Sequence, residues 1–128
     1  MNQMAFEVTL SQPFETAQER VIEALKQEGF GVLTEIDVKQ TLKKKLDVDR
    51  RPYTILGACN PPFAHQALQT EEEIGLLLPC NVIVYEQGET TAVAAFDQMI
   101  MSTILEKPEV QPIAQQVRER LERVISAL

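Results

Sequence analysis

The chain has 128 residues, of which 45% are hydrophobic and 24% charged, and its formal net charge is −7 at pH 7. This size and composition are typical of one globular domain, residues 1–128, that needs neither disulfides nor a structural metal to hold its core. The negative charge disfavours non-specific attraction to nucleic-acid phosphates or anionic lipids. We therefore expect no nucleic-acid partner and no membrane partner.

The sequence predicts neither export nor membrane insertion. Met1 to Leu10 has no basic stretch followed by an apolar segment, as a signal peptide would. The longest nearly apolar run, Ile74 to Cys80, is far shorter than the roughly 20 residues of a membrane helix. Two cysteines without an export signal indicate a reducing, cytoplasmic setting.

The first half of the chain alternates strand and helix patterns. Apolar residues alternate over 6–10, which predicts a strand, and a second strand is expected over 31–36. Between them, apolar residues at helical spacing from Phe14 to Leu25 predict an amphipathic helix. We expect Ser11 or Gln12 to cap this helix and Gly29 to end it.

Asp37 has Gln40 three residues later, which is the spacing of a capping box and predicts a short surface helix ending near Asp47. A third strand is expected over 52–59. The 20-residue connection over 60–79 is too long to lack structure in a compact domain. We expect a helical turn after Pro61 and a second capped helix that begins with Thr70 and Glu73.

Residues 81–85 and 90–96 predict a hairpin, and a final amphipathic helix should start between Glu109 and Gln111, with Pro112 in its first turn. Long crossover helices do not alternate cleanly with the strands. We therefore expect an α+β fold in which a strand and a helix are followed by four strands and a helix. The sheet should be largely antiparallel, with both long helices on one face.

The candidate site lies at the strand ends on either side of the long connection. Cys59 ends one strand and Cys80 begins the next, so antiparallel pairing would bring both to the same end of the sheet. His65, the only histidine, lies in the connection between them. Two thiolates and an imidazole are ligands that zinc or another thiophilic metal accepts. The alternative is that both cysteines are inert, small, buried side chains.

Asn60 and Asn81 follow the two cysteines directly. An asparagine at a strand end either bonds to its own turn backbone or points its amide into a pocket. We expect turn chemistry for Asn60, which precedes Pro61, and leave both roles open for Asn81.

Three further features have simpler interpretations than chemistry. Six of the twelve basic residues fall between Lys39 and Arg51 without aromatic neighbours for base stacking, which favours a solvated helix face. Glu71 to Glu73 fits a charged first helical turn. Met99 and Met101, which follow Asp97, fit either a core filler or an adaptable binding surface. The sequence contains no Walker loop, GxGxxG, HExxH or GxSxG motif.

The segments Gly57 to Pro61, Ala64 to Leu68 and Gly75 to Val82 together resemble the domain-of-unknown-function 302 family of small prokaryotic proteins. The Cys-Asn-Pro and Leu-Pro-Cys-Asn blocks carry most of the resemblance, which extends over nearly the whole chain. It implies a fold similar to TATA-binding-protein-like domains, in agreement with the order of elements above. It implies no activity, and the fold alone does not predict DNA binding.

The leading hypothesis is a small cytoplasmic binding or interaction module, homo-oligomeric, with a pocket formed by strand-end residues. These candidate residues are Cys59, Asn60, His65, Cys80 and Asn81. The rival hypothesis is a thiol- or metal-dependent enzyme or redox protein that uses Cys59 or Cys80 with His65. A third is a structural partner domain that docks through residues 39–51 or 99–101.

Overall fold

The computed structural model describes residues 4–128 and contains a five-stranded antiparallel sheet with the strand order β1-β5-β4-β3-β2. The strands are β1 (Ala5–Leu10), β2 (Gly31–Asp37), β3 (Tyr53–Cys59), β4 (Cys80–Gln87) and β5 (Thr90–Phe96). The α-helices are α1 (Phe14–Gln27), α2 (Val38–Leu46), α3 (Pro61–Thr70), α4 (Met101–Ile104) and α5 (Gln111–Ser126). Three short 3-10 helices complete the chain: η1 (Glu72–Leu77), η2 (Gln98–Ile100) and η3 (Pro108–Val110). The predicted α+β class and its order of elements are confirmed.

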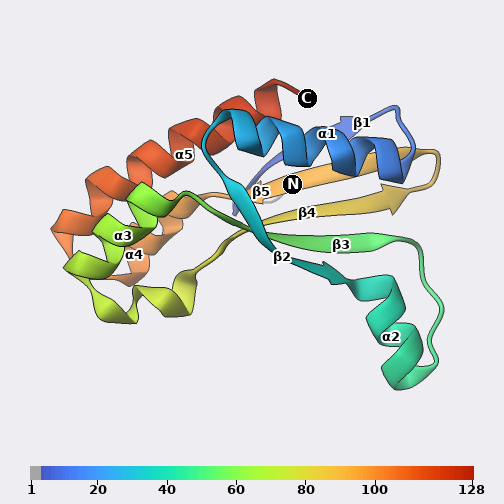
Figure 1. Ribbon diagram of the computed structural model, residues 1–128, viewed down its shortest axis with the longest axis horizontal. Helices are drawn as coiled ribbons and strands as arrows, with labels where there is room; N and C mark the ends of the chain where they lie inside the picture. The colour runs from blue at the N-terminus through green and yellow to red at the C-terminus, as the bar shows by residue number, and fades with distance from the viewer. Residues whose placement is uncertain (1–3) are drawn as a thin grey trace.

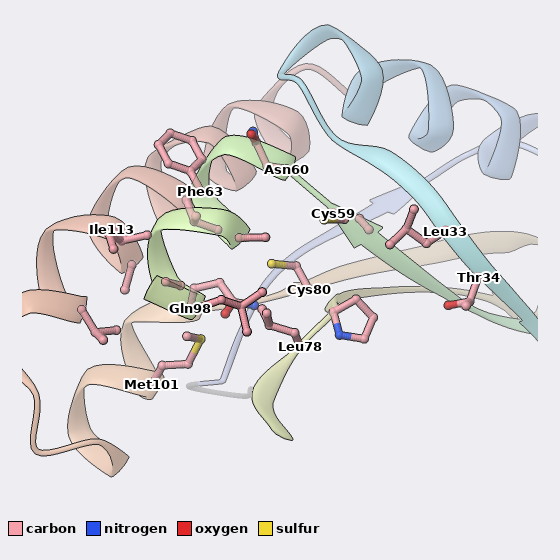
Figure 2. Close-up of a pocket in the computed structure, with 18 residues that line it drawn as sticks. Leu33, Thr34, Cys59, Asn60, Phe63, Leu78, Cys80, Gln98, Met101 and Ile113 are labelled. Carbon is pink, nitrogen blue, oxygen red and sulfur yellow. The ribbon is translucent and has the colours of Figure 1, made fainter. Parts of the chain in front are cut away.

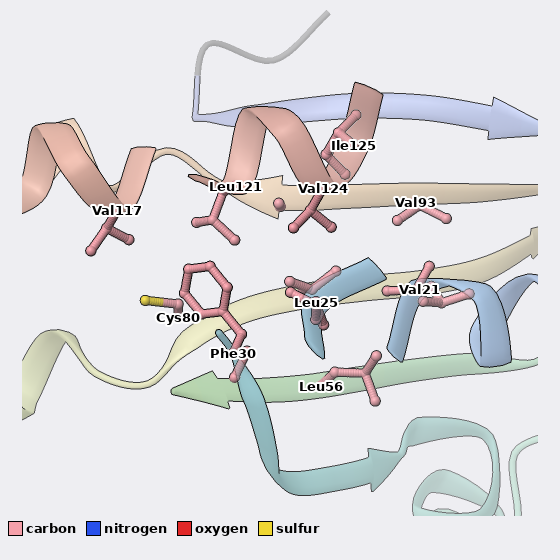
Figure 3. Close-up of a cluster of buried hydrophobic side chains, with 14 of the residues drawn as sticks. Val21, Leu25, Phe30, Leu56, Cys80, Val93, Val117, Leu121, Val124 and Ile125 are labelled. Carbon is pink, nitrogen blue, oxygen red and sulfur yellow. The ribbon is translucent and has the colours of Figure 1, made fainter. Parts of the chain in front are cut away.

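The two long helices, α1 and α5, lie side by side on one face of the sheet, as predicted (Figure 1). Figure 3 shows their apolar stripes meeting the side chains of the central strands. Val21 and Leu25 of α1 and Leu121 of α5 are fully buried against Leu56 of β3 and Val93 of β5. The 3.6-residue period of the helices and the two-residue period of the strands therefore bring their apolar faces together in one core.

The ends of the first two helices are only partly as predicted. Neither Ser11 nor Gln12 caps α1, because Pro13 itself occupies the N-cap position and its carbonyl accepts the first helical hydrogen bond from Ala17. Gly29 follows the end of α1 with a φ of +87°, a conformation that glycine adopts without steric strain. The Asp37 side chain caps α2 by accepting from the Gln40 backbone N–H at 2.9 Å, as predicted.

The long connection between β3 and β4 is structured, but its second helix starts differently from the prediction. Helix α3 continues to Thr70, whose hydroxyl donates to the Gln66 carbonyl inside the same helix. Glu71 instead caps η1, because its carboxylate accepts from the Glu73 backbone N–H at 3.0 Å. The start and first-turn proline of α5 are as predicted.

The other face of the sheet has no long helix over it among the described residues (Figure 1). Its central part is apolar and carries Ile55, Ile83 and Ala94 next to Tyr53 and Tyr85, whose stacked rings lie 5.3 Å apart. Within residues 4–128, no helix is both long and apolar enough to cross a lipid bilayer.

Candidate functional site

A cavity of about 370 Å³ opens where the strand ends of β3 and β4 meet α3, α5 and η2 (Figure 2). Its wall is almost wholly apolar, and none of the described residues that line it carries a charge. The principal wall residues are Phe63, Ala67, Leu78, Met101, Ile113 and Val117. Such a wall offers an apolar ligand a water-excluding environment and gives a charged ligand no counter-ion.

Small side chains and a separate packing cluster together account for the space. Alanines 58, 64, 67 and 114 line the cavity from β3, α3 and α5, and their single methyl groups leave room between the elements. Beyond them Ile74, Met101 and Val110 pack with Ala67 in a second buried cluster, apart from the main core. Met101 therefore fills core space beneath its loop and also forms part of the cavity wall.

Cys59 and Cys80 lie at the same end of the sheet, because Ala58 pairs directly with Cys80 in the antiparallel β3–β4 ladder. Both are free thiols and both line the cavity. Burial, with a smaller contribution from the nearby Cys59, raises the pKa of Cys80 from 9.0 to about 12. At neutral pH, Cys80 is therefore a protonated, weakly nucleophilic thiol in an apolar wall.

Asn60 also lines the cavity, but its amide is engaged in the structure around the site. It occupies the N-cap position of α3 without making a side-chain cap hydrogen bond. Its Nδ2 atom instead donates to the carbonyl oxygen of Glu28 at 3.2 Å, and Arg120 Nη1 donates to the same oxygen at 3.1 Å. Asn60 therefore links the end of α1 to the start of α3 and supports the part of the cavity wall that α3 forms.

The other two candidate residues are not brought to the cavity. His65 is exposed on α3, and Asn81 is exposed on β4, paired with Gly57 on the opposite face of the sheet. Neither residue lines the cavity. Across residues 4–128, no three His, Cys, Asp or Glu side chains are grouped so that they could hold a metal ion.

The sequence did not point to Gln98, which lies in η2 immediately after β5. Its side chain lines the cavity, is only 1% exposed, and has an Nε2 atom without a hydrogen-bond partner in the described structure. The neighbouring residues Met99 and Met101 fit either a core filler or a binding surface by residue type. A lone glutamine beside them has no pattern that reveals its burial.

Exposed apolar residues continue the cavity wall outward to its rim. Leu33 is 68% exposed and Leu68 is 42% exposed, and both line the opening. Leu33 reaches the rim because the β2–β3 register shifts between Val32 and Thr34, which is a bulge that redirects the side chain. The entrance is therefore as apolar as the interior.

A family model described as "Domain of unknown function DUF302" matches residues 6–128, which is nearly the whole chain. The chain belongs to the DUF302 family. This confirms the resemblance found in the Cys-Asn-Pro and Leu-Pro-Cys-Asn blocks, and no curated protein matches the chain.

A crystal structure of an uncharacterized conserved DUF302 protein from Bacillus stearothermophilus has the same architecture. The two chains are 31% identical, the match covers 98% of each, and the TM-score is 0.89. The DUF302 fold is thus shared over its full length. Neither the family description nor this relative names an activity, so only the site itself can indicate a function.

The basic segment and the acidic run of this DUF302 protein form local structure. Lys43 on α2 pairs with Asp47 at 2.8 Å and with Asp49 at 3.2 Å. Glu71 pairs with Lys107 at 3.5 Å and caps η1. Lys43 and Glu71 thus have oppositely charged partners within the chain, as expected for solvated helix ends.

Proposed function

We propose that this DUF302 protein is a cytoplasmic binding module that takes a small, mostly apolar ligand into the cavity at the strand ends. The observation that carries the proposal is the uncharged, almost wholly apolar wall around about 370 Å³. This volume falls within the range of roughly 300–1,000 Å³ found for small-molecule sites. The two free thiols suit the reducing compartment in which we place the protein.

The rival function, a thiol or metal enzyme, has less support from the same residues. A nucleophilic cysteine needs a lowered pKa and a base within reach, whereas burial raises the pKa of Cys80. The only histidine, His65, is exposed outside the cavity. Cys59, Cys80 and Asn60 are better explained as wall and support residues of a binding site.

The uncharged dye N-phenyl-1-naphthylamine, which fluoresces strongly in apolar surroundings, tests the proposal. We expect the wild-type protein to raise and blue-shift its emission in a saturable manner. Ala67→Leu and Ala114→Leu each place additional methyl groups in the cavity, because both alanines are buried in its wall. Each variant should weaken dye binding by at least about tenfold, which corresponds to about 1.4 kcal/mol.

Ala127→Leu provides the matched control, because Ala127 is exposed at the end of α5 and does not line the cavity. It should bind the dye as the wild type does. A direct reporter is Leu33→Trp at the rim, which adds the only tryptophan of the chain. The proposal is wrong if the dye neither binds saturably nor quenches this tryptophan. It is also wrong if Ala67→Leu and Ala114→Leu bind the dye as tightly as the wild type does.

We also propose that two copies of the chain associate through the uncovered sheet face. On that face β3, β4 and β5 carry no charged side chain among the described residues, and the neighbouring strand β1 places Glu7 beside Ala94, so a second copy of this acidic protein meets like charge only toward the β1 edge. Five strands at about 4.8 Å spacing and about 20 Å length give a flat area of roughly 480 Å². This flat area is smaller than the ~800 Å² that each partner contributes to a standard interface, which is typical of the smaller and weaker class of interfaces.

A further inference from the structure

The Gln98 amide is one of the few polar groups that line the mostly apolar cavity. Its side chain is 1% exposed, yet Nε2 has no acceptor among the residues that the structure describes. Buried N–H groups in folded proteins are nearly always paired, because an unpaired donor loses its water without replacement. Of the residues with such an unpaired buried atom in the described structure, Gln98 is the one that lines the cavity, where a bound molecule could supply the acceptor.

The surrounding hydrogen bonds hold Gln98 in place. Asp97, the residue before it, caps η2 by accepting from the Met99 backbone N–H at 3.0 Å. The same carboxylate oxygen lies 3.6 Å from Arg118 Nε on α5, which joins η2 to the helix that forms the far wall. Figure 2 shows the Gln98 side chain directed into the region between Leu78, Cys80 and Met101.

The ligand acceptor should be uncharged. No lysine, arginine or histidine lines the cavity, although Arg118 Nε on α5 is, like Gln98 Nε2, buried without a hydrogen-bond partner among the described residues. Arg118 lies beside Asp97, and Arg120 donates to the Glu28 carbonyl. A carboxylate would lose its hydration and gain one amide hydrogen bond, whereas a ketone or ester oxygen loses far less.

We propose that Gln98 determines specificity by donating a hydrogen bond from Nε2 to a carbonyl oxygen, so that the cavity takes small, uncharged, apolar carbonyl compounds. This inference rests on the proposed function, because it names the ligand class of the same cavity. The apolar wall supplies most of the affinity, and the amide selects among ligands of similar size.

Three probes of equal non-hydrogen atom count separate these contributions: cumene, acetophenone and benzoate. Each is titrated against the bound dye in the wild type and in Gln98→Met, a variant of similar side-chain length without the donor. The ratio of the cumene dissociation constant to the acetophenone dissociation constant is compared between the wild type and Gln98→Met. This comparison cancels the difference in hydrophobicity between the two probes. We expect this ratio to fall about five- to tenfold in Gln98→Met, as for one lost hydrogen bond. Benzoate should bind the wild type more weakly than acetophenone.

An independent readout uses the wild-type protein alone. In ¹⁵N-labelled protein the Gln98 side-chain amide resonance should move on addition of acetophenone, and move much less with cumene. An unchanged ratio in Gln98→Met, an unmoved amide resonance, or tighter binding of benzoate would each overturn this inference while the dye results leave the binding module intact. If no probe displaces the dye and the filled variants behave like the wild type, the proposed function itself fails.

Discussion

Cys59 and Cys80 show how two neighbouring residues of one type acquire different surroundings. Cys80 is 6% exposed and its thiol is enclosed by the core and the cavity wall, whereas Cys59 is only half-buried at the rim. The sequence indicates that both cysteines lie at strand ends, but it does not indicate how deeply either thiol is buried. Depth depends on α3 and α5 packing over the strand end through residues such as Phe63 and Val117, and this burial raises the thiol pKa.

The raised pKa of Cys80 predicts a specific loss of stability in alkali. The unfolded chain releases this thiol proton near pH 9.0, whereas the folded protein holds it until about pH 12. The stabilising contribution is therefore complete below pH 9 and declines as the pH rises toward 12. Over that window the free energy of unfolding should fall by up to about 1.4 kcal/mol per pH unit from this group.

Chemical denaturation of the wild type and Cys80→Ala from pH 8 to 11 measures this contribution as a difference in slope, because the other titrating groups are common to both proteins. The control is Ala127→Leu, an exposed substitution that changes no titrating group and should retain the wild-type slope. Equal slopes in the wild type and Cys80→Ala would contradict the prediction.

Asn60 illustrates a residue role that local sequence cannot supply. The Asn-Pro pair suggested turn chemistry, yet the side chain reaches the Glu28 carbonyl, 32 positions earlier in the chain. Arg120, from the last helix, donates to the same carbonyl oxygen. Three segments distant in sequence therefore share one acceptor, and only their assembly in the fold creates this contact.

In the connection between β3 and β4, the sequence pattern clearly predicts two helical segments. It does not determine the residue at which the first ends and the second begins. Thr70, Glu71 and Glu73 all stand where a cap is possible. Helix α3 runs through Thr70 because its hydroxyl bonds back to Gln66, which leaves the cap of η1 to Glu71. Helix ends depend on small differences between competing local hydrogen bonds, and packing against α5 and η3 adds to them.

Gly57 on β3 permits the end of this connection to approach the sheet. A Cβ atom at Gly57 would collide with the Thr34 side-chain oxygen and lie 2.8 Å from Cγ of Pro79. The Pro79 ring is rigid and forms part of the cavity wall. We therefore expect Gly57→Ala to lower the free energy of unfolding by about 1–3 kcal/mol, the range for overpacking a close contact. Urea denaturation measures this change.

Gly31→Ala is the matched control, because Gly31 lies in the same β2–β3 pair and has no atom within 4 Å of a built Cβ. It should leave the stability nearly unchanged or slightly raised, since alanine restricts the unfolded chain. The dye should bind Gly57→Ala more weakly and Gly31→Ala normally. Equal stability of the two variants would show that the close approach at Pro79 is not tight in solution.

For the whole molecule, the uncovered sheet face predicts self-association. Sedimentation at micromolar concentration should give twice the mass of the 14.4 kDa chain. Ile83→Lys places a charge in the middle of that face, on β4, and should shift the protein to the monomer. The variant's thermal midpoint should confirm that it remains folded.

Leu76→Lys is the control, because Leu76 is an 82% exposed apolar residue on η1. Removing it should leave the dimer intact. A wild type that sediments as a monomer, or an Ile83→Lys variant that remains a dimer, would refute association through this face.

The sequence by itself determined the α+β class, the order of strands and helices, the α2 cap and the arrangement of both long helices on one face. These features follow from apolar periodicity and from turn and cap residues, which act over a few positions. It also brought Cys59 and Cys80 to one sheet end, because the two strands flank a single connection. Only the tertiary structure decided that His65 and Asn81 lie outside the cavity and that Gln98 lines it with an amide nitrogen unpaired among residues 4–128. Those outcomes depend on which elements pack together, and contacts between segments distant in sequence leave no local pattern to read.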